Sequence, residues 1–256
     1  MNMTQHYDDI PAVRRSDLWE LRKSPAHYKY AVEHPKDQTP ALAFGTATHK
    51  YILEPDDFWN MYMLAPEVDR RTKDGKAEWN RFQIELREAE KTGVTVSDYE
   101  TIQEMRTALL QNKTAAALIE TGKHEVPFQW TDVTGEPCKI RPDCITEYNG
   151  KKYIVDYKTT TSCEPGAFER SCRHYGYKLQ AGMYTAGLFC VTLERYGFAF
   201  VAQEKDPPYA TRVYFCDEGF IDEGIQLFRD LMDLYHKCRA SDNWPGYEEG
   251  ELFGDE

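Results

Sequence analysis

The stretch IRPDCITEYNGKKYIVDYKTT, residues 140–160, carries charged side chains in a segment otherwise typical of a buried strand. Asp156 and Lys158 interrupt an apolar run that begins at Tyr153. Burying a charge costs on the order of several kcal/mol unless the charge is paired or binds a metal ion. The stretch therefore predicts a strand whose charged residues have partners.

Asn149-Gly150, in the middle of this stretch, is the strongest short-range signal for a two-residue turn between antiparallel strands. With such a turn Asp143 lies opposite Asp156, and Lys158 lies on the same face because side chains alternate along a strand. Opposed carboxylates repel each other unless a cation or a shared proton lies between them. The pattern indicates a divalent metal, and oxygen ligands favour Mg²⁺, with Mn²⁺ tolerated. A plain ion pair between Lys158 and one aspartate is the alternative.

The composition indicates one folded domain over residues 1–256, ending in a flexible acidic tail over 244–256. Of the 256 residues 41% are hydrophobic and 13% aromatic, and no Pro/Gly/Ser-rich linker divides the chain. No apolar run approaches the roughly 18 residues of a membrane span, and no signal peptide opens the chain, so we expect a soluble cytoplasmic protein without membrane contact. The 7 cysteines form no C-x-x-C pair, which argues against disulfide, zinc and iron–sulfur frameworks.

The net charge of −12 restricts the classes of DNA-binding protein that the sequence can represent. Proteins that coat DNA passively usually carry a basic surface. A bound divalent cation, however, can reverse the field locally in an acidic chain. The charge therefore counts against a passive DNA-coating protein more than against a metal-dependent nuclease.

Hydrophobic spacing and turn residues predict helices and strands along the whole chain. Helices are expected as two short segments within 14–34, and within 39–55, 76–92, 97–120, 165–173, 177–193 and 217–239. Strands are expected within 124–132, 137–148, 151–160, 195–204 and 210–217. Helices before and after a mostly antiparallel sheet predict a single α/β or α+β domain.

Four motifs, in the order of the chain, resemble those of one nuclease superfamily. RPD at 141–143 and IVDYKTT at 154–160 resemble the paired motif of the PD-(D/E)xK nucleases. FGTATHKYILEP, residues 44–55, resembles the helix that supplies a metal-binding histidine, here His49, in RecB-like and RecE-like nucleases. YKLQAGMYTAG, residues 177–187, resembles their Q-x-x-x-Y helix, and RRSDLWELRKSPAHYKY, residues 14–30, resembles their opening S-x-L…SP-x-x-Y segment.

The resemblance is greatest to the RecE-type exonucleases, the group of the exonuclease VIII nuclease domain. It implies an α/β restriction-endonuclease-like core with a mixed, mostly antiparallel central sheet flanked by helices. It also implies a Mg²⁺-dependent exonuclease that degrades duplex DNA from its ends, 5′ to 3′, and leaves 3′ overhangs for recombination by strand annealing. Such enzymes are phage- or prophage-encoded, act in the bacterial cytoplasm, form ring-like homo-oligomers such as trimers or tetramers, and work with a single-strand annealing protein of RecT type.

The resemblance also assigns roles to residues. The metal ligands are expected to be His49, Asp143, Asp156 and the backbone carbonyl of Tyr157. Lys158 would orient or deprotonate the attacking water, while Gln180 and Tyr184 would position the nucleotide or brace Lys158. Glu125 is either a further acidic ligand or a solvated charge, and the solvated charge is favoured. A basic group, either a DNA-backbone contact or a solvated face, comprises Arg170, Arg173, His174 and Lys178.

Two other functions are compatible with these motifs. One is a structure-specific endonuclease or resolvase on the same core. The other is a non-catalytic DNA-binding or assembly protein. The second is disfavoured because Asp143, Asp156 and Lys158 are all present, whereas a lapsed site would be free to lose them.

Overall fold

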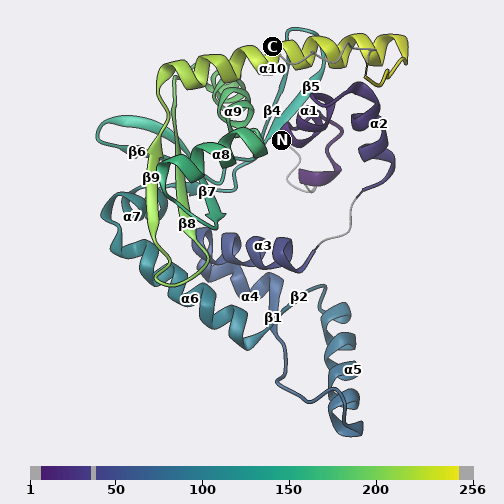
Figure 1. Ribbon diagram of the computed structural model, residues 1–256, viewed down its shortest axis with the longest axis vertical. Coiled ribbons are helices and arrows are strands. Elements are labelled where there is room, and N and C mark those ends of the chain that lie inside the picture. The colour runs from purple at the N-terminus through teal and green to yellow at the C-terminus, as the bar shows by residue number, and fades with distance from the viewer. Residues whose placement is uncertain (1–6, 36–38, 248–256) are drawn as a thin grey trace, which may run out of the picture.

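A five-stranded mixed sheet forms the centre of the computed structural model, which describes residues 7–35 and 39–247 (Figure 1). The strand order is β3-β6-β7-β8-β9. Their bounds are β3 Lys123–His124, β6 Cys144–Tyr148, β7 Lys151–Thr160, β8 Gly197–Glu204 and β9 Thr211–Phe215. All neighbours are antiparallel except β7 and β8, which are parallel. The predicted mixed, mostly antiparallel sheet is therefore confirmed.

The hairpin between β6 and β7 has the predicted register. Asn149 and Gly150 both have positive φ, 51° and 73°, as a type I′ turn requires, and Tyr148 pairs with Lys151. The ladder ends where Cys144 pairs with Val155, so Asp143 lies one residue before the first strand of the hairpin. Asp143 is therefore one position short of the ladder, next to the predicted place opposite Asp156 but without a strand pairing of its own.

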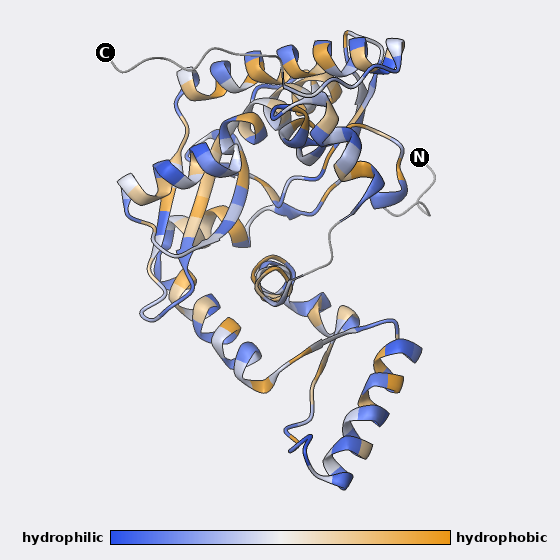
Figure 2. Cartoon of the chain, turned by 45° about the vertical axis from the view of Figure 1, so that its right-hand side comes forward, coloured by the Kyte–Doolittle hydropathy of each residue, from blue (hydrophilic) through white to orange (hydrophobic). Residues whose placement is uncertain are grey.

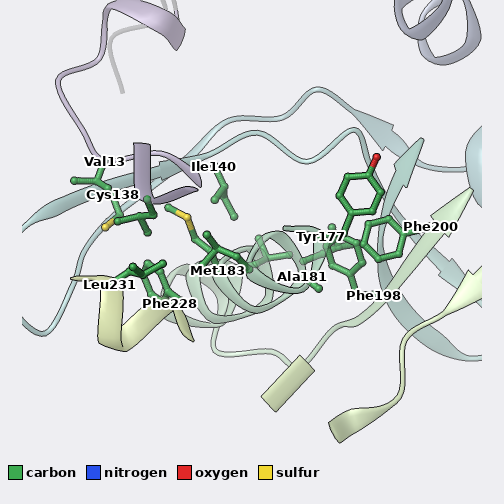
Figure 3. Close-up of a cluster of buried hydrophobic side chains, with 14 of the residues drawn as sticks. Val13, Cys138, Ile140, Tyr177, Ala181, Met183, Phe198, Phe200, Phe228 and Leu231 are labelled. Carbon is green, nitrogen blue, oxygen red and sulfur yellow. The ribbon is translucent and has the colours of Figure 1, made fainter. Parts of the chain in front are cut away.

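One face of the sheet is covered by helices that include the crossover from β7 to β8. These helices are α1 Arg15–Leu21, α2 Pro25–Glu33, α8 Pro165–Tyr175, α9 Tyr177–Thr192 and α10 Glu218–Ser241. Their core packs on Ile154 of β7 and on Phe198 and Phe200 of β8. Figure 3 shows α9 along the middle of this core, with Leu231 of α10 near one end and Phe200 near the other.

The opposite face is covered by α3 Pro40–Leu53, α6 Val96–Gln111 and α7 Lys113–Glu120. Val155 and Tyr157 of β7 contribute to the core on this side. The single helix expected within 97–120 is wrong, because the chain breaks at Asn112. The Asn112 side chain accepts a hydrogen bond from the Ala115 N–H at 3.1 Å and thereby caps α7.

Two of the expected strands are also divided. β4 Phe128–Thr131 and β5 Pro137–Ile140 pair with each other in a separate two-stranded sheet. The segments 124–132 and 137–148 were each expected to form one strand. Each is interrupted at a proline, Pro127 or Pro142, which has no N–H to donate to a ladder. At both breaks the chain passes between the central sheet and the smaller one.

Residues 62–95 form an extension that we call the arm, at the end of the molecule far from α10 (Figure 1). It consists of β1 Tyr62–Leu64, α5 Lys73–Glu88 and β2 Thr92–Val94, and it follows the short helices η2 Pro55–Asp57 and α4 Phe58–Met61. α5 begins and ends earlier than the expected 76–92. In Figure 2 hydrophobic residues are concentrated along the central strands, whereas α5 is mostly hydrophilic. The arm has a small core of its own, made of Ala65, Phe82 and Leu86.

The two ends of the described chain lie outside the central sheet. Residues Tyr7–Asp9 form a 3₁₀ turn, η1. Of the tail expected over 244–256, residues 248–256 lie outside the described residues, while the Trp244 ring lies 5.1 Å from that of Tyr28 on α2. Among the described helices, none combines the length and the apolar character that crossing a lipid bilayer demands. The seven cysteines are free thiols in the described ranges.

Candidate active site

The alternation of β7 places Asp156 and Lys158 on the face covered by α9. Asp156 is 1% exposed. Its Oδ1 accepts a hydrogen bond from Nε2 of Gln180, and the Lys158 Nζ lies 2.6 Å from its Oδ2. The latter contact is an ion pair poorly directed for hydrogen bonding, because no described group donates a hydrogen bond to that oxygen. Asp156 is thus fixed by Gln180 and neutralised by Lys158.

A second group of side chains gathers at the edge of β7 where β6 begins. His49 of α3 lies between two carboxylates, with Nε2 2.7 Å from Asp143 Oδ2 and Nδ1 3.5 Å from Glu125 Oε1. One ligand atom from each of the three residues lies within 4.8 Å of the others. We call these three residues the His–Glu–Asp cluster. One imidazole nitrogen and two carboxylate oxygens form a donor set that suits a divalent cation.

Asp143 is held in place by the backbone of β7. Its Oδ2 accepts a hydrogen bond from the Tyr157 N–H at 2.8 Å, which replaces the strand partner that β6 no longer supplies. The N–H and C=O of one strand residue point to the same side. The carbonyl of Tyr157, an expected metal ligand, therefore faces the same edge as the His–Glu–Asp cluster.

The structure contradicts the expectation that Glu125 is a solvated charge. Its side chain is 22% exposed and lies between His49 and Arg141, whose Nε is 2.8 Å from Oε2. Residue 125 has a φ of 53°, a left-handed conformation that turns the chain out of β3. The sequence signal was Pro127, which ends any strand through this segment and leaves Glu125 at the break rather than on a solvent-facing strand position.

Burial and neighbouring charges shift the pKa values of the carboxyl groups in different directions. Burial raises the pKa of Glu125 to about 7, and the charge of Asp143 adds to the shift. Burial also raises the pKa of Asp156, against the opposing effect of Lys158. For Asp143 burial acts in the same direction, but the charge and hydrogen bond of His49 outweigh it, so that the pKa is lowered.

The carboxyl groups of Asp143, Asp156 and Glu125 thus lie among the fixed cations Lys158 and Arg141, with Arg15 at longer range, and against the effect of burial the carboxylates raise the pKa of His49. Ionising all three in this environment is unfavourable unless further positive charge is present. The surplus of acidic oxygen beside an imidazole fits a bound divalent cation. Asp156 is not among the three residues of the His–Glu–Asp cluster, but its charge acts on both His49 and Asp143.

The remaining expected residues lie nearby or at the surface. Tyr184 lies on α9 one turn after Gln180 and meets Phe198 edge-on, with ring centroids 6.4 Å apart. Gln180 donates a hydrogen bond to Asp156, the ion-pair partner of Lys158, so any bracing of Lys158 acts through that carboxylate, and the positioning of a nucleotide stays a prediction. The basic group lies on α8 and α9, and two of its members already have acidic partners: Arg173 binds Glu169 and Lys178 binds Glu223.

Comparison with known proteins relates this arrangement to one family. The family described as "PDDEXK-like domain of unknown function (DUF3799)" matches residues 15–253. A crystal structure from Eubacterium rectale, named "Putative exonuclease", is similar with a TM-score of 0.61 at 13% sequence identity, and the match covers 94% of this chain and 88% of that one. The structure of SSO0001 matches with a TM-score of 0.37 at 16% identity over 90% and 79% of the two chains. No curated protein sequence matches the chain.

Proposed function

Because the chain belongs to the PDDEXK-like family DUF3799, we propose that it is a Mg²⁺-dependent nuclease that hydrolyses phosphodiester bonds of duplex DNA from an end. The observation that supports this most is that the His–Glu–Asp cluster lies beside the Asp156–Lys158 pair, close enough for the charge of Asp156 to act on His49 and Asp143. A purely structural ion-pair network would not need three carboxyl groups and an imidazole around so few cations.

The described side chains have separate tasks in this proposal. His49, Glu125 and Asp143 would hold the divalent ion, with Asp156 and the Tyr157 carbonyl next to it. A bound ion of this kind lowers the pKa of a water molecule and offsets negative charge on the scissile phosphate.

Lys158, whose Nζ is held 2.6 Å from Asp156 Oδ2, would orient the attacking water as a hydrogen-bond donor, or would accept the proton of that water after losing its own to solvent. Gln180 fixes the other oxygen of Asp156 and so indirectly fixes Lys158. Mn²⁺ would support the same reaction, because it accepts the same ligands.

The finer features of the proposal rest on the resemblance to RecE-type exonucleases. They are digestion from 5′ to 3′, release of 3′ overhangs for strand annealing, a ring-like homo-oligomer, and a RecT-type annealing partner in a phage- or prophage-carrying bacterium. Each follows from that resemblance and is tested separately from the hydrolysis itself.

Digestion of a linear duplex with distinct labels on its 5′ and 3′ ends tests activity and direction together. We expect Mg²⁺-dependent loss of the 5′ label first, no loss in EDTA, and an intact covalently closed circle. Asp143→Asn should abolish the activity, whereas Glu147→Gln, an equal charge change at an exposed position of β6, should not. Cutting of the closed circle would favour the endonuclease alternative, and no digestion in Mg²⁺ or Mn²⁺ would refute the enzyme.

A further inference from the structure

A cavity of about 360 Å³ lies in front of Lys158, on the face of the sheet that α9 covers. Arg15 at the start of α1 lines it on one side, and the rings of Tyr175 and Tyr177 line it on another. Gln180, which holds Asp156, also contributes to the lining. The cavity is therefore continuous with the proposed active site, and the inference drawn from it rests on the proposed function.

The guanidinium of Arg15 lines this cavity and has one hydrogen-bond donor without an acceptor. Its Nη2 donates a hydrogen bond to the backbone carbonyl of Tyr175, which fixes the guanidinium against the end of α8. Its Nε is buried, and no described atom accepts a hydrogen bond from it. A buried donor without an acceptor is unfavourable, and a guanidinium remains charged in proteins. The group therefore has both the charge and the free donor to bind an anion, and its planar fork suits phosphate.

Arg14 also lines the cavity, but unlike Arg15 it has acidic partners. Arg14 is engaged by two carboxylates, with Asp17 Oδ1 3.3 Å from its Nε and Asp8 Oδ1 3.4 Å from its Nη1. Its charge is thus balanced by protein groups. Arg15 has no carboxylate within ion-pair distance among the described residues, and Asp156 acts on it only at longer range, so it is the member of the pair that is better able to bind a ligand.

An aromatic column ends at the same cavity. Phe200 of β8 stacks on Tyr177 at 5.3 Å between ring centroids, and Tyr177 stacks on Tyr175 at 5.8 Å. Tyr177 is buried, whereas Tyr175 is 53% exposed. The column therefore starts in the core and finishes with the half-exposed ring of Tyr175, which the His174 ring meets at 86° with centroids 4.6 Å apart, and one more flat ring can stack on its exposed part. Nucleobases stack on such rings with little dependence on sequence.

We propose that this cavity binds one nucleotide of the DNA strand that is cut, with its phosphate at Arg15 and its base on Tyr175. The two features are complementary, because Arg15 recognises only the phosphate and Tyr175 recognises only the base. The nucleotide would lie beside Lys158, so that the next phosphodiester bond is presented to the catalytic residues. Arg15 and Tyr175 are then positioning residues for the strand.

Calorimetric titration of the full chain with thymidine 5′-monophosphate, in EDTA to prevent hydrolysis and metal binding, tests the cavity directly. We expect the mononucleotide to bind roughly tenfold or more tightly than either thymidine or deoxyribose 5-phosphate, because each of these lacks one of the two contacts. Equal affinities for the mononucleotide and thymidine would overturn the phosphate contact, and equal affinities for the mononucleotide and deoxyribose 5-phosphate would overturn the base contact.

Substitutions then locate the binding. Arg15→Gln and Tyr175→Ala should each weaken mononucleotide binding by roughly tenfold. Arg229→Gln, the same charge change at an exposed position of α10 outside the cavity, should leave it unchanged. Tyr175 is exposed, so its variant keeps the test decisive if Arg15→Gln fails to fold. Unchanged affinity in Tyr175→Ala would refute the inference.

The outcome is separable from that of the proposed function. If the native chain digests linear duplex DNA but binds no mononucleotide, this inference fails and the nuclease stands. If the chain binds the mononucleotide but digests no DNA with either metal ion, the proposed hydrolysis fails instead.

Discussion

Glu125 illustrates how a single residue can be brought into a site by a break in the chain. Its backbone adopts a left-handed conformation that costs about 1–2 kcal/mol for a residue with a side chain. In return its carboxylate reaches His49 and Arg141. Strain of this kind is tolerated where the surrounding contacts fix the conformation, and such positions often belong to functional sites.

Replacement of Glu125 by glutamine tests its role as a ligand. The amide oxygen can still accept a hydrogen bond from Arg141, so the local structure should persist while the negative charge is lost. We expect Mn²⁺ affinity, measured by isothermal titration calorimetry, to fall by roughly tenfold or more. The matched control is Glu147→Gln on the exposed side of β6, which should bind Mn²⁺ like the native chain. Native affinity in Glu125→Gln would remove Glu125 from the ligand set.

At the scale of the elements, the crossing of α9 and α10 determines where Gln180 and Tyr184 lie. The two helices meet at Gly182 and Gly224. A Cβ added at Gly224 would lie 2.2 Å from the Lys178 carbonyl oxygen, and one at Gly182 would lie 2.0 Å from the Gly224 carbonyl carbon. Backbone atoms of this kind cannot move aside without shifting a whole helix. The glycines therefore set the distance between α10 and the helix that carries the site residues.

Gly224→Ala should consequently destabilise the protein by about 1–3 kcal/mol, as overpacking in a close contact does. Gly219→Ala is the control on the same helix, because a Cβ there would be 3.5 Å from the nearest atom, an ordinary contact. Its free energy of unfolding should stay within about 1 kcal/mol of the native value, since alanine favours helix more than glycine. Urea denaturation measures both, and equal stability of the two variants would contradict the close approach.

The elements also show how far the sequence could predict the site. The Asn149-Gly150 turn determined the register of β6 and β7 because its backbone conformation is local. Gln180 and Tyr184 were indicated by the resemblance of residues 177–187 to a Q-x-x-x-Y helix, and their i, i+4 spacing puts them on one face of α9. The sequence did not predict the position of Glu125, because that position depends on which sheet each half of the segment 124–132 joins. That choice is made by long-range packing, and local patterns carry little information about it.

At the scale of the whole molecule, the arm differs from the rest in how it is stabilised. The buried residues of α5 are Gly75, Phe82 and Leu86, and the last two pack with Ala65 in a small cluster separate from the cores on the central sheet. α9, by contrast, is buried along most of its length. Segments with few buried apolar contacts open locally without unfolding the domain.

Hydrogen–deuterium exchange should reveal this difference. We expect the amides of α5 to exchange roughly ten times faster or more than those of α10, because opening α5 disrupts only the arm. α10 is a suitable reference, since it is also exposed along one side but contributes Phe228, Leu231 and Met232 to the main core. Equal protection of the two helices would show that the arm is a full part of the cooperative unit.

The hydrogen bond between the Tyr157 N–H and the Asp143 carboxylate bears on how related chains can be judged to be active or degenerate. A descendant that had lost catalysis would still be selected to fold, and removing Asp143 would leave a strand amide without its acceptor. The polar contacts of the His49 and Glu125 side chains are made within the site and with Arg141, so drift could erase them at less cost. In a diverged relative, a retained His49 and Glu125 would therefore be better evidence of a working enzyme than a retained Asp143.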